Sequence, residues 1–149
     1  MLEDLYQQVI LDHNRAPRNF RKIERAPHHA EGYNPLCGDR VTVYVRFADD
    51  TVTDISFEGS GCAISKASAS LMTEILKGKQ RAEVDALFEG FHALVTGQAA
   101  ASGQAEPDLG KLRVFSGVRE FPMRVKCATL AWHTMRAALE DSQKVASTE

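Results

Sequence analysis

Three cysteines and one aspartate are the residues of this chain whose types and spacing could do chemistry. They stand in three short motifs: Asn-Pro-Leu-Cys-Gly-Asp at residues 34–39, Gly-Ser-Gly-Cys at residues 59–62 and Arg-Val-Lys-Cys at residues 124–127. Three thiolates and one carboxylate make a four-ligand set of the kind that a tetrahedral zinc ion accepts. The sequence therefore predicts a metal site built from Cys37, Asp39, Cys62 and Cys127.

Each of these residues also has a simpler interpretation. A cysteine is often a small buried hydrophobic residue, so three unrelated core cysteines are the main alternative, and Asp39 could instead cap a turn. Two observations favour the metal site. Cys37 lies in a loop beside Pro35 and Gly38, where core packing is poor, and Asp39 follows it by two residues. If the backbone is extended there, both side chains point the same way.

A zinc ion held by three thiolates and one carboxylate would carry excess negative charge, which nearby cations would offset. Arg124 and Lys126 stand just before Cys127, and Arg124 is a candidate for electrostatic support of the site. The alternative is that both are exposed charges preceding a helix. The five histidines lack the paired helical spacing of a hydrolytic zinc motif and are expected mostly at the surface. No phosphate-binding glycine loop or serine nucleophile motif is present.

The composition sets the broad class of the protein. A chain of 149 residues with 44% hydrophobic content is expected to form one domain over residues 1–149. The formal charge of −2 gives no global reason to expect nucleic acid or an anionic membrane as a partner. Because no export signal or apolar span is apparent, we expect a cytoplasmic protein with reduced thiols.

Hydrophobic periodicity predicts the elements that must position the four candidate ligands. A helix is expected from Leu2 to about His13, followed by a basic segment up to Arg25 that is either a solvated loop or a docking surface for an acidic partner. Alternation over residues 41–47 and 53–57 predicts a hairpin that turns at residues 49–50. Cys37 and Cys62 flank this hairpin, so its two open ends bring them side by side.

Three further helices are expected, over residues 64–76, 82–95 and from 125 onward. Cys62 then lies at a helix N-terminus, where backbone N–H groups favour a thiolate, and Cys127 lies in the first turn of the last helix. Residues 97–113 are expected to form a mobile insertion, and residues 143–149 a frayed tail. The fold class is predicted to be α+β, with a small antiparallel sheet packed against helices.

The motifs together resemble the U-type iron-sulfur cluster assembly family, which includes IscU, the N-terminal part of NifU, and SufU. The likeness spans nearly the whole chain and rests on residues 5–13, 17–20, 34–39, 58–65 and 121–130. In two details the chain resembles the SufU branch of the family. Lys126 stands where IscU-like scaffolds carry a histidine before the third cysteine. An extra segment also occupies roughly residues 97–113.

The resemblance implies that zinc binds Cys37, Asp39, Cys62 and Cys127, and that Cys37 accepts persulfide sulfur. The implied donor is a SUF-type pyridoxal-phosphate cysteine desulfurase, and downstream iron-sulfur assembly proteins are the implied recipients. Because zinc deprotonates a thiol but also blunts its reactivity, docking is expected to free Cys37 by exchanging it for a partner ligand such as histidine.

Two other functions use the same residues. In the first, the thiolates would assemble a [2Fe-2S] cluster or bind iron, and the chain would be a scaffold that passes the cluster to apo-proteins. Lys126 counts against this function because an ammonium group is a poor cluster ligand. In the second, a closed zinc site would serve only to hold a binding module together.

Overall fold

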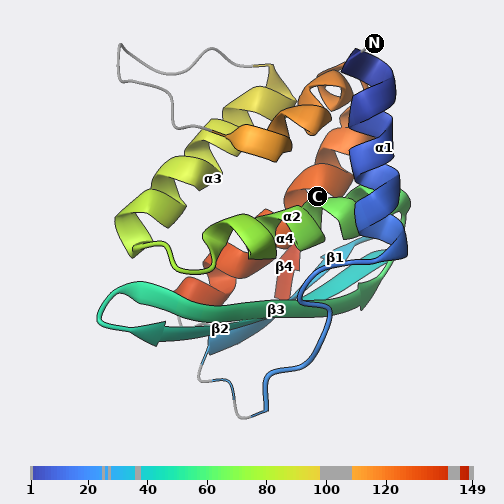
Figure 1. Ribbon diagram of the computed structural model, residues 1–149. Helices are drawn as coiled ribbons and strands as arrows, with labels where there is room; N and C mark the ends of the chain where they lie inside the picture. The colour runs from blue at the N-terminus through green and yellow to red at the C-terminus, as the bar shows by residue number, and fades with distance from the viewer. Residues whose placement is uncertain are drawn as a thin grey trace.

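An antiparallel sheet with helices packed on one face forms the frame of the protein (Figure 1). The computed structural model describes residues 2–24, 26, 28–35, 38–97, 109–140 and 145–147. Cys37 and residues 98–108 of the expected insertion lie outside the described residues. The α+β class predicted from the sequence is confirmed.

The sheet contains β1 (His28–Asn34), β2 (Asp39–Ala48), β3 (Thr51–Ser60) and the short β4 (Val145–Ser147), in the order β3-β2-β1-β4. The first three strands are antiparallel, and β4 runs parallel to β1. The predicted hairpin is β2–β3, whose turn residues Asp49 and Asp50 both have positive φ, as a tight hairpin turn requires. Its open ends place Asp39 close to the start of the following helix.

Two strands were not expected from the sequence. β1 buries Ala30, Gly32 and Asn34 on its inner face, and these small or polar residues give no alternating hydrophobic signal. β4 lies in the tail that was expected to be frayed, and this prediction was wrong for residues 145–147, which pair with residues 31–33. Backbone pairing, which is largely independent of side-chain type, decided both strands.

Four α-helices match the expected positions: α1 (Leu2–Arg15), α2 (Ala63–Leu76), α3 (Arg81–Thr96) and α4 (Pro122–Leu139). A 3-10 helix, η1 (Gly110–Glu120), precedes α4 and was not expected. It includes the end of the segment predicted to be a mobile insertion. Leu112 is fully buried there, so this end of the segment belongs to the core.

The core lies between the sheet and the helices, and α4 runs through it. Trp132 of α4 stacks on Phe91 of α3 with ring centroids 4.7 Å apart, and Phe115 of η1 meets Phe91 edge-on at 5.8 Å. α4 also packs against α2, β1 and β2. Because α4 is enclosed on several sides, large apolar contacts hold it in the core.

The basic segment after α1 runs along the edge of β3. The N–H of Phe57 donates to the carbonyl of Asn19, and the N–H of Arg21 donates to the carbonyl of Phe57, each over 3.0 Å. Arg21 pairs with Asp54 and Arg18 with Asp12. These two arginines therefore find acidic partners within the chain, which weakens the interpretation of the segment as a docking surface.

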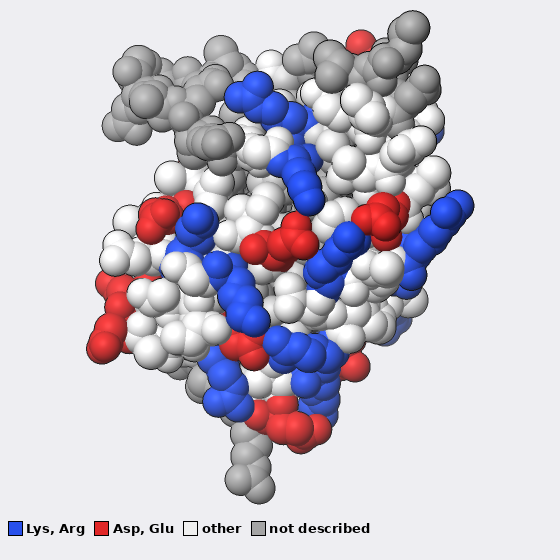
Figure 2. All heavy atoms as spheres, viewed as in Figure 1, with Lys and Arg blue, Asp and Glu red and all other residues white. Residues whose placement is uncertain are grey.

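The described surface mixes charges of both signs. Figure 2 shows acidic side chains interspersed among basic ones on the face in view, in keeping with 18 basic and 20 acidic residues in the chain. Among the described residues, none of the helices combines the length and apolar character that crossing a membrane requires.

Candidate metal centre

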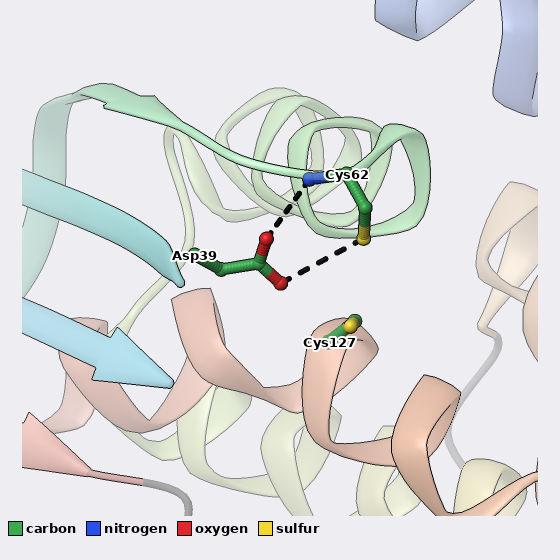
Figure 3. Close-up of side chains that lie close together, drawn as sticks. All are labelled: Asp39, Cys62 and Cys127. Atoms are coloured by element: carbon green, nitrogen blue, oxygen red, sulfur yellow. Dashed lines mark hydrogen bonds between the residues drawn. The ribbon is translucent and has the colours of Figure 1, made fainter. Parts of the chain in front are cut away.

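Asp39 is the first residue of β2, and its side chain is buried at the open end of the hairpin. Its Oδ1 accepts a hydrogen bond from the backbone N–H of Cys62 over 2.9 Å (Figure 3). A buried carboxylate needs such donors because burial removes it from water. The contact confirms that the two ends of the hairpin meet, as its antiparallel pairing predicted.

Cys62 is the N-cap residue of α2. Its backbone is extended, with φ of −71° and ψ of 166°, and its Sγ accepts a hydrogen bond from the N–H of Ser65 over 3.4 Å. N-cap positions usually carry an oxygen acceptor, and here sulfur fills that role. The predicted location of Cys62 at a helix N-terminus is therefore confirmed, and the thiolate form gains a backbone donor.

Gly61 allows the carboxylate of Asp39 to come this close. Its φ is +159°, and a Cβ at this position would overlap Oδ1 of Asp39. The Gly-Ser-Gly-Cys motif drew attention to Cys62, but sequence reasoning gave Gly61 no role of its own. The only available signal was a glycine directly preceding a candidate ligand.

Cys127 reaches the same place from α4. That helix begins at Pro122, so Cys127 follows its first residue by five positions and lies in the second turn. The prediction of a first-turn position was wrong, because the helix starts earlier than the hydrophobic pattern indicated. Cys127 is 4% exposed. Its position therefore depends on how α4 packs, and not on the unpaired N–H groups of a helix end.

The ligand atoms of Asp39, Cys62 and Cys127 all lie within 4.8 Å of one another. Figure 3 shows the three side chains converging from β2, the start of α2 and α4. Zinc bonds of about 2.3 Å to sulfur and 2.0 Å to oxygen at tetrahedral angles put these two atoms about 3.5 Å apart. Sγ of Cys62 lies 3.7 Å from Oδ2 of Asp39. The donor set and its spacing therefore fit a zinc ion.

Cys37, the fourth predicted ligand, lies outside the described residues, so its place in the site stays a prediction. The expectation of an extended backbone between Cys37 and Asp39 is wrong at Gly38. Gly38 has a φ of +74°, and its N–H donates to the carbonyl of Asn34 over 2.8 Å. The backbone between Cys37 and Asp39 is therefore not extended at Gly38, and the argument from alternating strand faces does not apply.

The pKa values of the two described thiols are shifted in opposite directions. A hydrogen bond from Cys127 lowers the pKa of Cys62 to about 7, with help from the N–H of Ser65 and against the effect of burial. The same hydrogen bond, burial and the Asp39 carboxylate raise the pKa of Cys127 far above its ordinary value. Without a cation and above about pH 7, the pair therefore holds one proton, on Cys127, and Cys62 is the thiolate. A divalent cation would allow both sulfurs to ionise.

Arg124 and Lys126 lie on α4 shortly before Cys127. Arg124 is exposed, and its guanidinium lies over the ring of Phe121 at 4.4 Å. Lys126 is half-exposed. Arg124 stands one helical turn before Cys127 and thus on the same face of α4. Its electrostatic role stays a prediction.

The histidines do not follow the expectation that most lie at the surface. His29 alone is exposed, whereas His13 is buried and its Nδ1 lies 2.7 Å from Oγ of Ser70. His92 and His133 pack around the ring of Phe88. Among the described residues, Asp39, Cys62 and Cys127 form the one group of three or more side chains with metal-ligand spacing.

Known proteins are similar to this chain in sequence and in fold. The NifU-like N-terminal domain family matches residues 5–128. An iron-sulfur cluster assembly scaffold protein, IscU, from Streptococcus pyogenes serotype M1 is 38% identical, over 95% of this chain and 86% of its own. The zinc-dependent sulfurtransferase SufU from Bacillus subtilis is 39% identical, over 90% of this chain and 88% of its own.

A solved structure extends the likeness to three dimensions. It is described as an iron-sulfur cluster assembly scaffold protein for the SUF system from Fervidobacterium islandicum AW-1. It superposes with a TM-score of 0.81 at 38% identity and covers 89% of this chain and 94% of its own. The matched sequence, the shared fold and the cysteine motifs lead to one conclusion: this chain belongs to the NifU-like N-terminal domain family, together with IscU and SufU proteins.

Proposed function

We propose that this chain is a zinc-dependent sulfurtransferase of iron-sulfur cluster assembly, which accepts sulfur on Cys37 from a SUF-type cysteine desulfurase. The observation that carries the proposal is the convergence of Asp39, Cys62 and Cys127, from three separate elements, within 4.8 Å. The similarity to the B. subtilis zinc-dependent sulfurtransferase supports it, since that similarity covers 90% of this chain.

The proposed chemical step is a thiol–persulfide exchange. The Cys37 thiolate attacks the terminal sulfur of the desulfurase persulfide, and a new S–S bond forms as the old one breaks. The desulfurase cysteine leaves as a thiolate, and Cys37 becomes the persulfide. No external oxidant or reductant is needed, because the sulfur moves with its oxidation state unchanged. Downstream iron-sulfur assembly proteins would then receive the sulfur.

The remaining site residues hold the centre together during this exchange. When bound, zinc would keep the thiols ionised and restrain Cys37 until a partner docks. Asp39, Cys62 and Cys127 lie on elements that pack into the core, so they can retain their positions while Cys37 reacts. Arg124, on the same face of α4 as Cys127, would offset the negative charge of the cluster.

The second candidate function is a scaffold on which a [2Fe-2S] cluster is assembled. The S. pyogenes relative named as an IscU scaffold favours it, and so does the thiol-rich ligand set. Lys126 argues against it, because a lysine stands where a cluster-binding histidine would be needed. We therefore rank sulfur transfer first.

The two functions predict different results with a SUF-type desulfurase. Alanine formation from cysteine is measured with the zinc-loaded chain, the metal-free chain and Cys37→Ala, and Ser56→Ala serves as a control variant distant from the three ligands. Stimulation by the zinc-loaded chain and by Ser56→Ala, lost in Cys37→Ala, would support sulfur transfer. Absence of stimulation, with a labile cluster forming on the chain when iron and sulfide are supplied, would favour the scaffold.

A further inference from the structure

We propose that Ser68 is a positioning residue that ties α2 to α4 and thereby sets how closely Cys62 and Cys127 approach. The inference rests on the proposed metal site and adds a residue that does not itself contact the ligands. Ser68 lies on α2, which Cys62 caps, and it bonds to the residue that follows Cys127 on α4.

Two buried hydrogen bonds make the connection. The hydroxyl of Ser68 donates to the backbone carbonyl of Ala128 over 2.5 Å, and Nε1–H of Trp132 donates to the hydroxyl oxygen over 3.2 Å. Ser68 and Ala128 are fully buried, and Trp132 is 1% exposed. The Ser68 hydroxyl thus donates one hydrogen bond and accepts another, and its two partners lie one turn apart on α4.

The surrounding contacts cannot set this position equally well. Close to Ser68 and Ala128 along their helices, the buried side chains include the small residues Ala67, Ala69 and Ala131. Small side chains allow close approach but interlock less than large ones, so they define the axial position of two helices less sharply. Hydrogen bonds have narrow distance and angle ranges and therefore fix the axial register.

The connection lies close enough to the ligands to control them. Ser68 follows Cys62 by six residues, which is about 9 Å along a helix, and Ala128 is adjacent to Cys127. A shift of α4 against α2 at this point would be passed almost unchanged to the two sulfurs, because both helices are rigid over that length. The sulfurs lie within 4.8 Å of each other, so even a small shift disturbs tetrahedral geometry.

The chain offers a matched control for removing this hydroxyl. Ser56 on β3 is also fully buried, and its Oγ makes no hydrogen bond within the part of the chain that the structure describes. Ser56→Ala therefore deletes a buried serine hydroxyl without breaking a helix-to-helix connection. Ser68→Ala deletes the same atom and breaks two bonds.

The first measurement is zinc affinity, by competition with a chromophoric chelator. Ser68→Ala should bind zinc about 10-fold or more weakly than the unmodified chain, as for loss of other groups that support metal ligands. Ser56→Ala should bind as tightly as the unmodified chain. Equal affinities for the unmodified chain and a folded Ser68→Ala would overturn the proposal.

A second measurement needs no metal and separates this inference from the proposed function. In metal-free chains carrying Cys37→Ser, Cys62 and Cys127 are equilibrated with glutathione buffers. The two thiols are oxidised to one disulfide while one glutathione disulfide is reduced to two thiols, and the equilibrium constant gives their effective concentration. Ser68→Ala should lower this effective concentration relative to Ser56→Ala.

If even the unmodified chain fails to bind zinc, the zinc-dependent function is wrong, and the disulfide equilibrium alone decides the role of Ser68. An unchanged equilibrium in Ser68→Ala would then refute the positioning role.

A double variant tests whether the indole N–H of Trp132, left without its acceptor, causes the loss of zinc affinity. Ser68→Ala leaves Nε1–H of Trp132 buried without its partner, which by itself could disturb the fold. The double variant Ser68→Ala with Trp132→Phe removes that group. Continued weak zinc binding in the double variant would support the connection through Ala128. Recovery to the affinity of Trp132→Phe alone would show that the stranded indole caused the loss, and would overturn the proposal.

Discussion

The carboxylate of Asp39 accepts the backbone N–H of Cys62, which joins the first residue of β2 to the cap of α2 over 2.9 Å. This one bond holds a hard oxygen ligand and a soft sulfur ligand at 3.7 Å. It also orients the start of α2, so that the Ser65 N–H meets the Cys62 sulfur. Hydrogen bonds within the chain therefore orient both ligands.

Replacement of Gly61 should weaken metal binding. A Cβ there would overlap Oδ1 of Asp39, so Gly61→Ala must displace the carboxylate from Cys62. We expect zinc affinity to fall by about 10-fold or more, measured by chelator competition. Gly78→Ala is the matched control, because Gly78 also has positive φ but a Cβ there meets nothing. If both variants bind zinc equally well, Gly61 does not position Asp39.

Cys62 should be the reactive thiol of the metal-free site. In a Cys37→Ser chain, alkylation by iodoacetamide should follow an apparent pKa of about 7 and mass spectrometry should place the label on Cys62. Cys127 should stay unmodified over the same range, because it is buried and its pKa is raised. A rate that rises only near pH 9, or label on Cys127 first, would contradict the assignment of the shared proton.

Acid should destabilise the protein through His13. Burial, followed by the charge of Arg18, lowers the pKa of His13 below 6.5, although Glu74 and Asp12 act in the opposite direction. The unfolded chain therefore binds more protons below about pH 6.5, and the free energy of unfolding must fall as the pH drops through that range. Stability from this group is complete above pH 6.5. Urea unfolding of the metal-free chain across this range measures the effect.

His13→Asn is the variant that checks this assignment. It should cost about 1–3 kcal/mol at neutral pH, because the hydroxyl of Ser70 loses the buried imidazole and keeps only the N–H of Arg18. It should also reduce the pH dependence, leaving the contribution of His133, whose pKa is likewise lowered by burial. An unchanged slope in His13→Asn would mean that other groups cause the acid sensitivity.

A larger residue at Gly32 should force α4 away from the sheet. A Cβ at Gly32 would overlap Oγ1 of Thr134, which lies on α4 two turns after Cys127. Gly32→Ala should lower the free energy of unfolding by about 1–3 kcal/mol in urea denaturation. Thr134→Ala in the same chain removes the overlapping atom and should restore part of the loss. Without any restoration, the close approach of β1 and α4 would not be the cause.

The sequence was sufficient for the elements whose pattern is local. Val41, Val43 and Val45 alternate because one face of β2 is buried, and this period identified the hairpin and its turn. The same pairing explained why Asp39 meets Cys62, since both lie at the open end of that hairpin. Ligand types could also be read directly, because thiols and carboxylates bind metals by chemistry that does not depend on fold.

The tertiary structure decided what depends on contacts between distant segments. β1 and β4 form through backbone pairing that their side chains do not signal, and η1 is held by burial of residues such as Leu112. Cys127 reaches Asp39 across 88 positions only because α4 packs against both α2 and the sheet. The roles of Ser68, Trp132 and Gly61 at the site also depend on contacts between segments that are distant in the sequence. Packing and hydrogen bonding between helices set their roles, and neither leaves a periodic mark in the sequence.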